Sequence, residues 1–314
     1  MNAANLLMAC TLDCVLGDPR WMPHPVRLLG WGIRQCERGI RRMVVSPARQ
    51  RMAGCVMACG IPASAYVAGE WAIDMGYSMH PVVGDGLWVV LAYTTVAARD
   101  LADHALAVYR ALRDGELEEA RRALSKIVGR DTALLSESEV VRASVETVAE
   151  NTSDGVIAPL MYLALGGPAL ALAYKAVNTL DSMIGYRTPE YEHIGWASAK
   201  VDDLVNWLPA RISAVLIVIA AILCFRTGGE AWRIFRRDGA KHPSPNAGRP
   251  EAAMAGALQV RLGGTNTYQG IRVMRPTLGD PRRPLVPIQI CRAVRLMWIV
   301  WGLGVVGAVL RYAV

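Results

Sequence analysis

Ionisable and amide side chains stand on both sides of one apolar run in the middle of the chain. Before the run come Glu146, Glu150, Asn151 and Asp154, and after it come Lys175, Asn178 and Asp181. Charged groups are costly beside sequence that suits a lipid environment, so they usually mark a functional site. The chemistry of this protein is therefore expected where these groups lie.

The carboxylates before the run have helical spacing. Glu146 and Glu150 share one helix face, and Asp154 would continue it if the helix held. Ligation by oxygen alone suits Mg²⁺, particularly Mg²⁺ shared with phosphate oxygens. The alternative is a solvated helix end with Asn151 as its C-terminal cap.

The polar groups after the run also share a helical face. Lys175, Asn178 and Asp181 stand at i, i+3 and i+6. Lysine can neutralise phosphate, whereas aspartate can hold a metal ion or accept a proton. The alternative is a structural Lys–Asp pair.

A third group of polar residues, a DDxxN pattern, lies further along the chain. Asp202 and Asn206 can face the same way on a helix, whereas Asp203 cannot. Paired acids before an apolar segment predict either a second metal site or a charged interfacial cap. Arg211 follows just after Pro209.

Two further polar segments contain histidine. Near the N-terminus, Asp13, Asp18, His24 and Arg27 surround a Gly/Pro turn that could present His24 to the site. His242 and Asn246 lie in a later Pro-rich loop; taken in isolation, each histidine fits a surface position. The chain has no GxxxxGK[ST], HExxH or GxSxG pattern, so the corresponding mechanisms lack support.

The composition predicts an integral membrane protein. The chain has 314 residues, of which 53% are hydrophobic and only 19% charged, and its mean hydropathy is +0.25. About 20 apolar residues cross the hydrocarbon of a bilayer. The candidate spans are 52–73, 82–98, 291–313, the shorter 210–225, and 6–16, which contains Asp13 and is partial. No cleavable signal peptide is expected, because an acid interrupts the first apolar run.

The positive charge follows the membrane topology. Seven arginines lie between Arg27 and Arg51, whereas residues 74–81 have no Lys or Arg. The positive-inside rule places the first loop and the basic segment 226–287 in the cytoplasm, and the short loop outside. No nucleic-acid partner is expected, because stacking aromatics are not interleaved with the arginines. The seven cysteines form no CxxC pair and suit packing rather than metal binding.

The fold class is expected to be all-α, a polytopic membrane protein with a polar cavity at a membrane face. We predict one membrane domain over residues 1–314, with 99–150 as a cytoplasmic helical insert that breaks at Gly115. Ser136 and Glu139 have the spacing of a capping box for the helix that runs through Glu146. Another helix should start near Pro250, and no strand is predicted.

Three stretches together resemble a known family. They are LDCVLGDPRWMPHPVRLLG, VRASVETVAENTSDGVIAPLMYLALGGPALALAYKAVNTLDSMIGYRTPEYEHIGWASAKVDDLVNWLPARISA and HPSPNAGRPEAAMAGALQVRLGG. They resemble the CobD/CbiB cobalamin-biosynthesis proteins, the adenosylcobinamide-phosphate synthases. The resemblance is spread over nearly the whole chain. Its departures are minor: Lys200 stands where arginine is expected, and 265–268 reads as a variable turn.

The resemblance implies an ATP-dependent ligase that forms an amide bond. The family joins the amine of aminopropanol, or of its O-phosphate, to a propionate carboxylate of adenosylcobyric acid. ATP would convert the carboxylate to an acyl phosphate, which the amine attacks in a site that excludes water. The implied cofactors are ATP as co-substrate and Mg²⁺. The implied partners are the two substrates, the lipid bilayer, and either further copies of the chain or other late cobalamin-pathway membrane enzymes.

The resemblance also gives the polar residues expected roles. The catalytic candidates are His24, Lys175, Asp181 and His242, of which one histidine would take the amine proton. The candidates for binding substrate or phosphate are Arg27, Asn151, Asn178, Arg211, Ser244 and Asn246. The candidate metal ligands are Glu146, Glu150, Asp154 and Asp202.

Cytoplasmic ATP constrains the topology. If residues 155–173 crossed the cell membrane completely, Lys175 and Asp202 would lie outside. We therefore expect this run to be re-entrant or packed in a polar cavity, with the active site facing the cytoplasm. Two alternatives remain: a membrane prenyltransferase that uses Mg-diphosphate, suggested loosely by the acidic motifs, and a non-enzymatic corrinoid transporter or scaffold.

Overall fold

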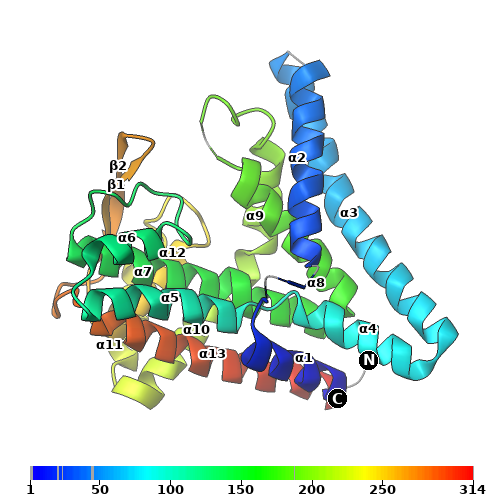
Figure 1. Ribbon diagram of the computed structural model, residues 1–314. Coiled ribbons are helices and arrows are strands. Elements are labelled where there is room, and N and C mark those ends of the chain that lie inside the picture. Colours follow the sequence, from blue (N-terminus) through cyan, green and yellow to red (C-terminus); the bar gives the residue numbers. More distant parts are fainter. Residues whose placement is uncertain (1–2, 20, 23, 44–45, 187, 314) are drawn as a thin grey trace. The chain divides into compact units, whose positions relative to one another are not determined.

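A computed structural model describes residues 3–19, 21–22, 24–43, 46–186 and 188–313. Nearly all of its regular structure is helical (Figure 1). Five helical stretches are long and apolar enough to cross a membrane, namely 47–79, 81–113, 137–184, 207–225 and 288–311. The described chain is thus an all-α polytopic membrane protein in its architecture, as the composition predicts.

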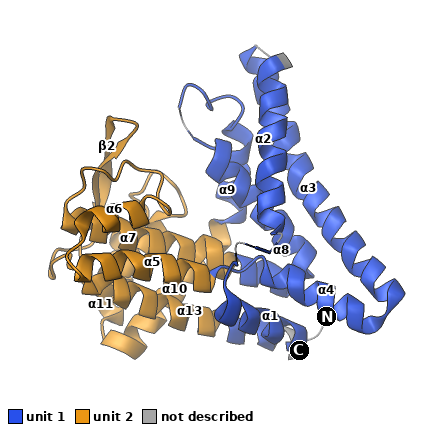
Figure 2. Ribbon diagram, viewed as in Figure 1, with its two compact units in different colours: residues 1–97, 159–206, 305–314 blue, residues 98–158, 207–304 orange. Residues whose placement is uncertain are grey.

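The chain divides into two compact units (Figure 2). The first contains residues 1–97, 159–206 and 305–314, and the second contains residues 98–158 and 207–304. The predicted insert 99–150 therefore belongs to a unit that also includes most of the C-terminal third.

The first unit consists of helices from both halves of the chain. Its complete helices are α1 (Ala3–Leu16), α2 (Pro25–Met43), α3 (Pro47–Met79), α4 (Pro81–Tyr93) and α9 (Trp196–Val205), and it holds nearly all of α8 (Ala158–Ile184). Proline at the first position starts α3 and α4, where the missing N–H costs nothing. Buried Ile33, Met57, Leu180, Ile184 and Ile194 form a shared core.

Two predicted spans differ from the observed helices. Helix α3 has 33 residues and continues past both ends of the predicted span 52–73. The predicted span 82–98 is not one helix, because α4 ends at Tyr93 and a turn precedes α5 (Ala98–Arg113). The backbone N–H of Thr95 bonds the Ala92 carbonyl in that turn, and the next helix then begins.

The apolar run in the middle of the chain is irregular at two points. Helix α7 (Glu137–Asn151) continues into a π-helical turn, η1 (Thr152–Ile157), where the sequence predicts a break. Helix α8 then kinks at Gly166 and Gly167, directly before Pro168. Gly167 has φ 69° and ψ −168°, a conformation essentially restricted to glycine. The run is therefore a broken helix, whereas its re-entrant course stays a prediction.

The second unit packs short amphipathic helices around longer ones. It contains α5, α6 (Leu117–Leu124), α7, η1, α10 (Trp207–Phe225), α11 (Gly228–Asp238) and α12 (Gly248–Leu258), and most of α13 (Ile288–Ala313). Helices α5 and α6 are separated at Gly115, which has φ 80°. Glu139 accepts the Ser136 N–H at 2.8 Å, which confirms the predicted capping box. The predicted helix near Pro250 is α12.

The prediction that no strand is present was wrong. Strands β1 (Leu262–Tyr268) and β2 (Ile271–Leu278) pair antiparallel around Gln269 and Gly270. Both turn residues have positive φ, as the two-residue turns that match strand twist require. The Asp131 carboxylate accepts both of their N–H groups, at 3.1 and 2.8 Å. The sequence TNTYQGIRVM contains parts of both strands and the turn of this hairpin, but its glycines led to the prediction of an irregular turn region.

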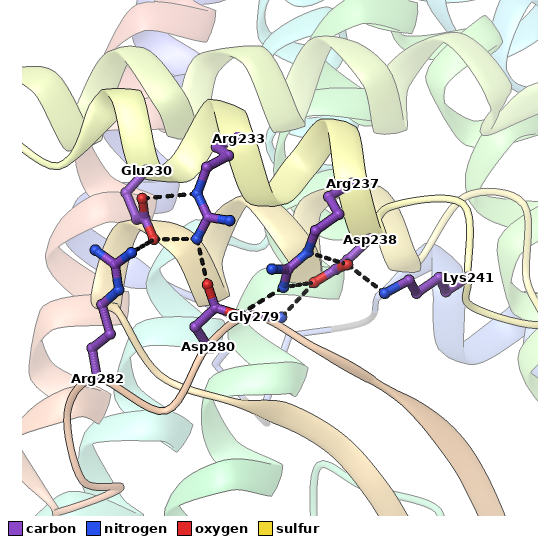
Figure 3. A network of polar contacts seen from close by, with 8 residues as sticks. All are labelled: Glu230, Arg233, Arg237, Asp238, Lys241, Gly279, Asp280 and Arg282. Atoms are coloured by element: carbon purple, nitrogen blue, oxygen red, sulfur yellow. Dashed lines mark hydrogen bonds and ion pairs between the residues drawn. The ribbon is translucent and has the colours of Figure 1, made fainter.

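A charged network fastens the exit of the hairpin to α11 (Figure 3). The Asp238 side chain is buried and accepts hydrogen bonds from Arg237, Lys241 and the Gly279 N–H. Asp280 pairs with Arg237 at 2.9 Å and also with Arg233. These bonds lower the pKa of Asp238, although its burial acts in the opposite direction.

Candidate functional site

The first unit contains a cluster of amides and carboxylates between α8 and α9. Asn206 donates to Asp202 at 2.9 Å and accepts from the buried Tyr174 hydroxyl at 2.8 Å. Asn178 also hydrogen-bonds Asp202, and Asp181 lies close enough to act on it electrostatically. The polar face of α8 that contains Asn178 and Asp181 and the DDxxN pattern of residues 202–206 therefore meet.

The environment of Asp202 keeps its proton. Burial raises the pKa of Asp202 to about 7, and the neighbouring Asp181 carboxylate contributes in the same direction. Hydrogen bonds from Asn206 and Asn178 oppose this shift. A carboxyl group that titrates near neutral pH can accept or release a proton, or it can bind a cation that replaces the proton.

The other predicted residues of the first unit lie on α8 and near the start of α2. Lys175 is partly buried on α8, one turn before Asn178. His24 is buried rather than on the surface: its Nδ1 accepts the Val26 N–H at 3.3 Å, and its Nε2 lies 3.4 Å from Asp18. Arg27 is exposed and donates to the Met22 carbonyl. Asp13 is fully buried in α1.

In the second unit, Glu146 is held by two arginines. Its carboxylate lies 2.7 Å from Arg130 and 3.2 Å from Arg142, and it accepts the Gly263 N–H at 2.8 Å. Arg142 also donates to the carbonyls of Gly263 and Thr265. All three charged side chains are at least nine-tenths buried. Glu146 thus fastens the hairpin to α7, and its oxygens are occupied by cations of the protein.

The remaining acidic candidates on this face are more accessible. Glu150 is exposed, Asn151 donates back to the Thr147 carbonyl at 3.0 Å, and Asp154 lies partly buried in the π-helical turn. Among the described residues, no three His, Cys, Asp or Glu side chains are grouped as ligands of one metal ion. Two carboxylates with phosphate oxygens still suit Mg²⁺, which commonly keeps only one or two protein carboxylates.

His242 faces an arginine. Its Nε2 lies 3.2 Å from Arg275 of β2, and its Nδ1 accepts the Ser244 N–H at 3.1 Å. Burial lowers the pKa of His242 to about 4, and the Arg275 charge lowers it further. A neutral imidazole has one N–H and one acceptor, so the two contacts compete for the acceptor nitrogen. His242 is thus an uncharged base beside a cation.

Glu251 of α12 was missed by the sequence reasoning and lies in the same group. It is 5% exposed. Burial raises the pKa of Glu251 well above its ordinary value, and the Glu146 and Glu150 carboxylates add to the shift. Arg275 and Arg130 act in the opposite direction. Glu251 stands between a proline and two alanines, and this pattern does not indicate a functional residue.

Two arginines without a carboxylate between them lie where α10 packs against α12. Arg211 and Arg249 are close enough to repel each other electrostatically. The Nε atom of Arg249 is buried and has no hydrogen-bond partner among the described residues. Arg211 stacks on Trp207, 4.0 Å from the ring centre. Two neighbouring guanidinium groups that have no ion-pair partner within the described part of the chain are suited to bind phosphate or carboxylate.

The loop before α12 orients its own backbone. The Ser244 hydroxyl accepts the N–H groups of Asn246 and Ala247, at 3.2 and 3.3 Å, and so shapes the start of the helix. Asn246 is buried, and its carbonyl accepts the Arg249 N–H. This geometry brings Ser244 and Asn246 to the same loop as His242 and Arg249.

The predicted site residues are therefore divided between the two units, and His24, Arg27 and Lys175 belong to the first. Asn178, Asp181 and Asp202 gather in the first unit, together with Asn206 and Tyr174. The second unit contains Glu146, Glu150, Asp154, Asn151, Arg211, His242, Ser244 and Asn246. The sequence reasoning missed Arg130, Arg142, Arg249, Glu251 and Arg275. Their only signal was the unusual number of charged residues in segments that are otherwise small and apolar.

Taken together, the helical architecture and the buried polar clusters define a polytopic membrane protein with polar sites inside its helical units. The sequence matches the family described as CobD/Cbib protein over residues 6–297. The chain is 52% identical to "Cobalamin biosynthesis protein CobD" of Geobacter metallireducens, over 94% of this chain and 92% of that protein. This chain belongs to the CobD/CbiB family.

Enterobacterial proteins are similar over the same length. "Cobalamin biosynthesis protein CobD" of Klebsiella pneumoniae is 46% identical over 95% of this chain and 93% of its own. "Cobalamin biosynthesis protein CbiB" of Salmonella typhimurium is 46% identical over 93% and 92%. No solved structure matches the chain significantly.

Proposed function

We propose that this chain acts in cobalamin biosynthesis as an ATP-dependent ligase that forms an amide bond. The substrates are adenosylcobyric acid and aminopropanol or its O-phosphate, and the product is adenosylcobinamide or its phosphate. Family membership supports the pathway. The observation that carries the reaction type is the Arg211–Arg249 pair. The Nε atom of Arg249 is buried and has no hydrogen-bond partner among the described residues, and the loop that precedes Arg249 contains the neutral His242.

The proposed reaction has two steps. A propionate oxygen attacks the γ-phosphorus of ATP, the bond to the β-phosphate oxygen breaks, and ADP leaves. The amine nitrogen then attacks the acyl carbon, loses one proton, and displaces inorganic phosphate. Arg211 and Arg249 neutralise the phosphates, and Mg²⁺ held by Glu150 and Asp154 would supply additional charge stabilisation when it is bound.

His242 is the base that this proposal favours for the amine proton. In the free protein burial keeps its imidazole neutral, and the Arg275 charge acts in the same direction. An anionic substrate that pairs with Arg275 would partly cancel that charge, so the pKa of His242 would rise on binding. His242 would thus become a stronger base only when substrate is present.

The assay that tests the proposal uses purified full-length protein with adenosylcobyric acid, ATP, Mg²⁺ and each candidate amine. Amide and ADP should form together in a one-to-one ratio, and only when the amine and the corrinoid are both present. Amide formation without ATP, or no amine consumption in a folded membrane-inserted sample, would rule out the ligase.

Arg249→Gln tests the phosphate pair. The substitution removes a charge-assisted contact, so the KM for ATP should rise about 10- to 100-fold. Arg236→Gln is the matched control, because Arg236 is an exposed arginine of the same unit that lies over Trp232. If both variants keep the ATP KM of the parent protein, Arg249 does not contact the nucleotide.

A further inference from the structure

An apolar groove lies in the first unit between α2 and α3. Its volume is about 570 Å³, and its walls are almost wholly hydrocarbon. Leu28, Gly32 and Cys36 line it from α2, Ala65 and Ala68 from α3, and Leu172 from α8. None of the residues assigned to the ligase reaction lines this groove.

The groove is about as long as one lipid leaflet is deep, which would place Pro25–Cys36 beside acyl chains, whereas the arginine distribution predicts a cytoplasmic loop from residue 27 onward. Its lining on α2 extends from Pro25 to Cys36, and eleven helical residues rise about 16 Å. The hydrocarbon core of a bilayer is about 30 Å thick, so one leaflet is about 15 Å deep. The α3 wall belongs to a helix long and apolar enough to span the membrane, and its Val67 and Trp71 are exposed. The groove can thus receive one extended acyl chain.

Arginines lie beyond the Cys36 end of the groove. Gly39 continues the line of Gly32 along α2, because residues seven apart share a helix face. Arg38 and Arg42 lie on one side of that line, about 100° and 60° around the helix, and are exposed. Within the described part of the chain they have no carboxylate partner, since Glu37 pairs with Arg41 at 2.8 Å instead. The apolar groove therefore ends at uncompensated positive charge.

We propose that this groove binds an anionic phospholipid. One acyl chain lies between α2 and α3, and the phosphate contacts Arg38 and Arg42. A zwitterionic lipid offers the same acyl chain, but its headgroup cation is repelled by the two arginines. This site is independent of the proposed ligase chemistry, and its lipid would hold the arginine end of α2 at the membrane surface.

Filling the groove tests the acyl-chain contact. A Cβ atom added at Gly32 would meet nothing within 4 Å, and Gly32 lines the groove, so the side chain of Gly32→Leu should extend into it. Gly60→Leu is the matched control: Gly60 lies in α3, is equally open, and does not line the groove. Native mass spectrometry of each full-length protein in detergent, with added phosphatidylglycerol, should show at least tenfold less bound lipid for Gly32→Leu alone.

Removing the charge tests the headgroup contact and does not alter the groove. Arg38→Gln with Arg42→Gln should weaken phosphatidylglycerol binding about tenfold and leave phosphatidylcholine of the same acyl chains unchanged. The control exchanges two exposed arginines of the second unit, Arg261→Gln with Arg272→Gln. Equal binding of the two lipids by the parent protein would overturn the proposal. So would a Gly32→Leu protein that keeps its lipid but loses an oligomeric state that the parent protein shows in the same detergent, because a second copy would then occupy the groove.

Discussion

The protonation of Asp202 depends on neighbours that come from two helices. Burial and the Asp181 carboxylate favour the neutral acid, whereas the Asn206 and Asn178 amides favour the anion. The first pair outweighs the second and raises the pKa of Asp202 to about 7, so the acid and its anion are about equally populated at neutral pH. His242 is the opposite case, since burial and Arg275 hold a base uncharged. Both residues are thus prepared to exchange a proton when a charged ligand alters their surroundings.

The raised pKa of Asp202 predicts a pH-dependent stability. The folded state binds the proton more tightly than the unfolded chain, so this contribution is complete below pH 4 and is lost as the pH rises to about 7. Asp202→Asn keeps a neutral side chain at every pH. The variant should therefore melt at a higher temperature than the parent protein at pH 8, and at a similar temperature at pH 4.

Thermal unfolding in detergent at both pH values measures this difference. Asp203→Asn is the control, because Asp203 lies on another side of α9 and pairs with Lys200 at 3.8 Å. If Asp202→Asn destabilises the protein equally at both pH values, Asp202 is ionised in the folded state.

The irregular elements have a common physical cause. Helix α8 is interrupted where Gly166, Gly167 and Pro168 follow one another, and α7 widens into a π-helical turn at Thr152. At both points the regular α-helical hydrogen-bond pattern is interrupted, whereas the sequence remains mostly apolar. Broken helices inside membrane proteins occur where the freed backbone groups are buried in protein or line a cavity. The hairpin is the other irregular element, and α7 holds it through Glu146 and Arg142.

Gly167→Ala tests whether the kink of α8 is obligatory. Its backbone angles are open to glycine but strained for alanine, so the variant should lose about 1–3 kcal/mol of unfolding free energy. Gly60→Ala provides the comparison, since Gly60 lies in a regular helix with open space around it. Equal melting temperatures for the two variants would show that α8 can straighten.

At the scale of the whole molecule, membrane topology sets which compartment each group meets. Five long apolar stretches establish a multi-pass protein, whereas the side on which each end lies is a prediction from the arginine distribution. The candidate residues at the Asp181 end of α8 can meet cytoplasmic ATP only if that end of the helix faces the cytoplasm. The chain also separates into two compact units that each combine distant parts of the sequence.

Cysteine labelling of a cysteine-free background decides the orientation. Ser182→Cys, exposed on α8, should react with a membrane-impermeant maleimide only from the cytoplasmic side. Ser78→Cys, exposed near the end of α3, should react from the periplasmic side and controls for reagent access. Labelling of Ser182→Cys from the periplasm alone would contradict the re-entrant run and a cytoplasmic position of the Asn178, Asp181 and Asp202 cluster.

Local patterns were sufficient for several features of this protein. Hydropathy and length indicated the membrane helices, the Ser136–Glu139 spacing predicted a cap, and Gly115 marked a break. Residues 178, 181, 202 and 206 were selected by type and spacing, and the structure places them in one cluster. The family is evident from the same sequence. These features depend on neighbours in the chain, which is why they could be predicted.

Tertiary structure alone decided what each charge contacts. Nothing near Glu146 in the sequence indicates that Arg130 and a distant glycine N–H would satisfy its carboxylate, so a predicted metal ligand is occupied by arginine. The neutral state of His242 likewise depends on Arg275, which lies 33 residues further along the chain. Charge interactions depend on distance through space and on burial, and neither is encoded in local spacing. The sequence by itself therefore determined the helices, the membrane and the family, and only the fold determined which acids and bases are paired.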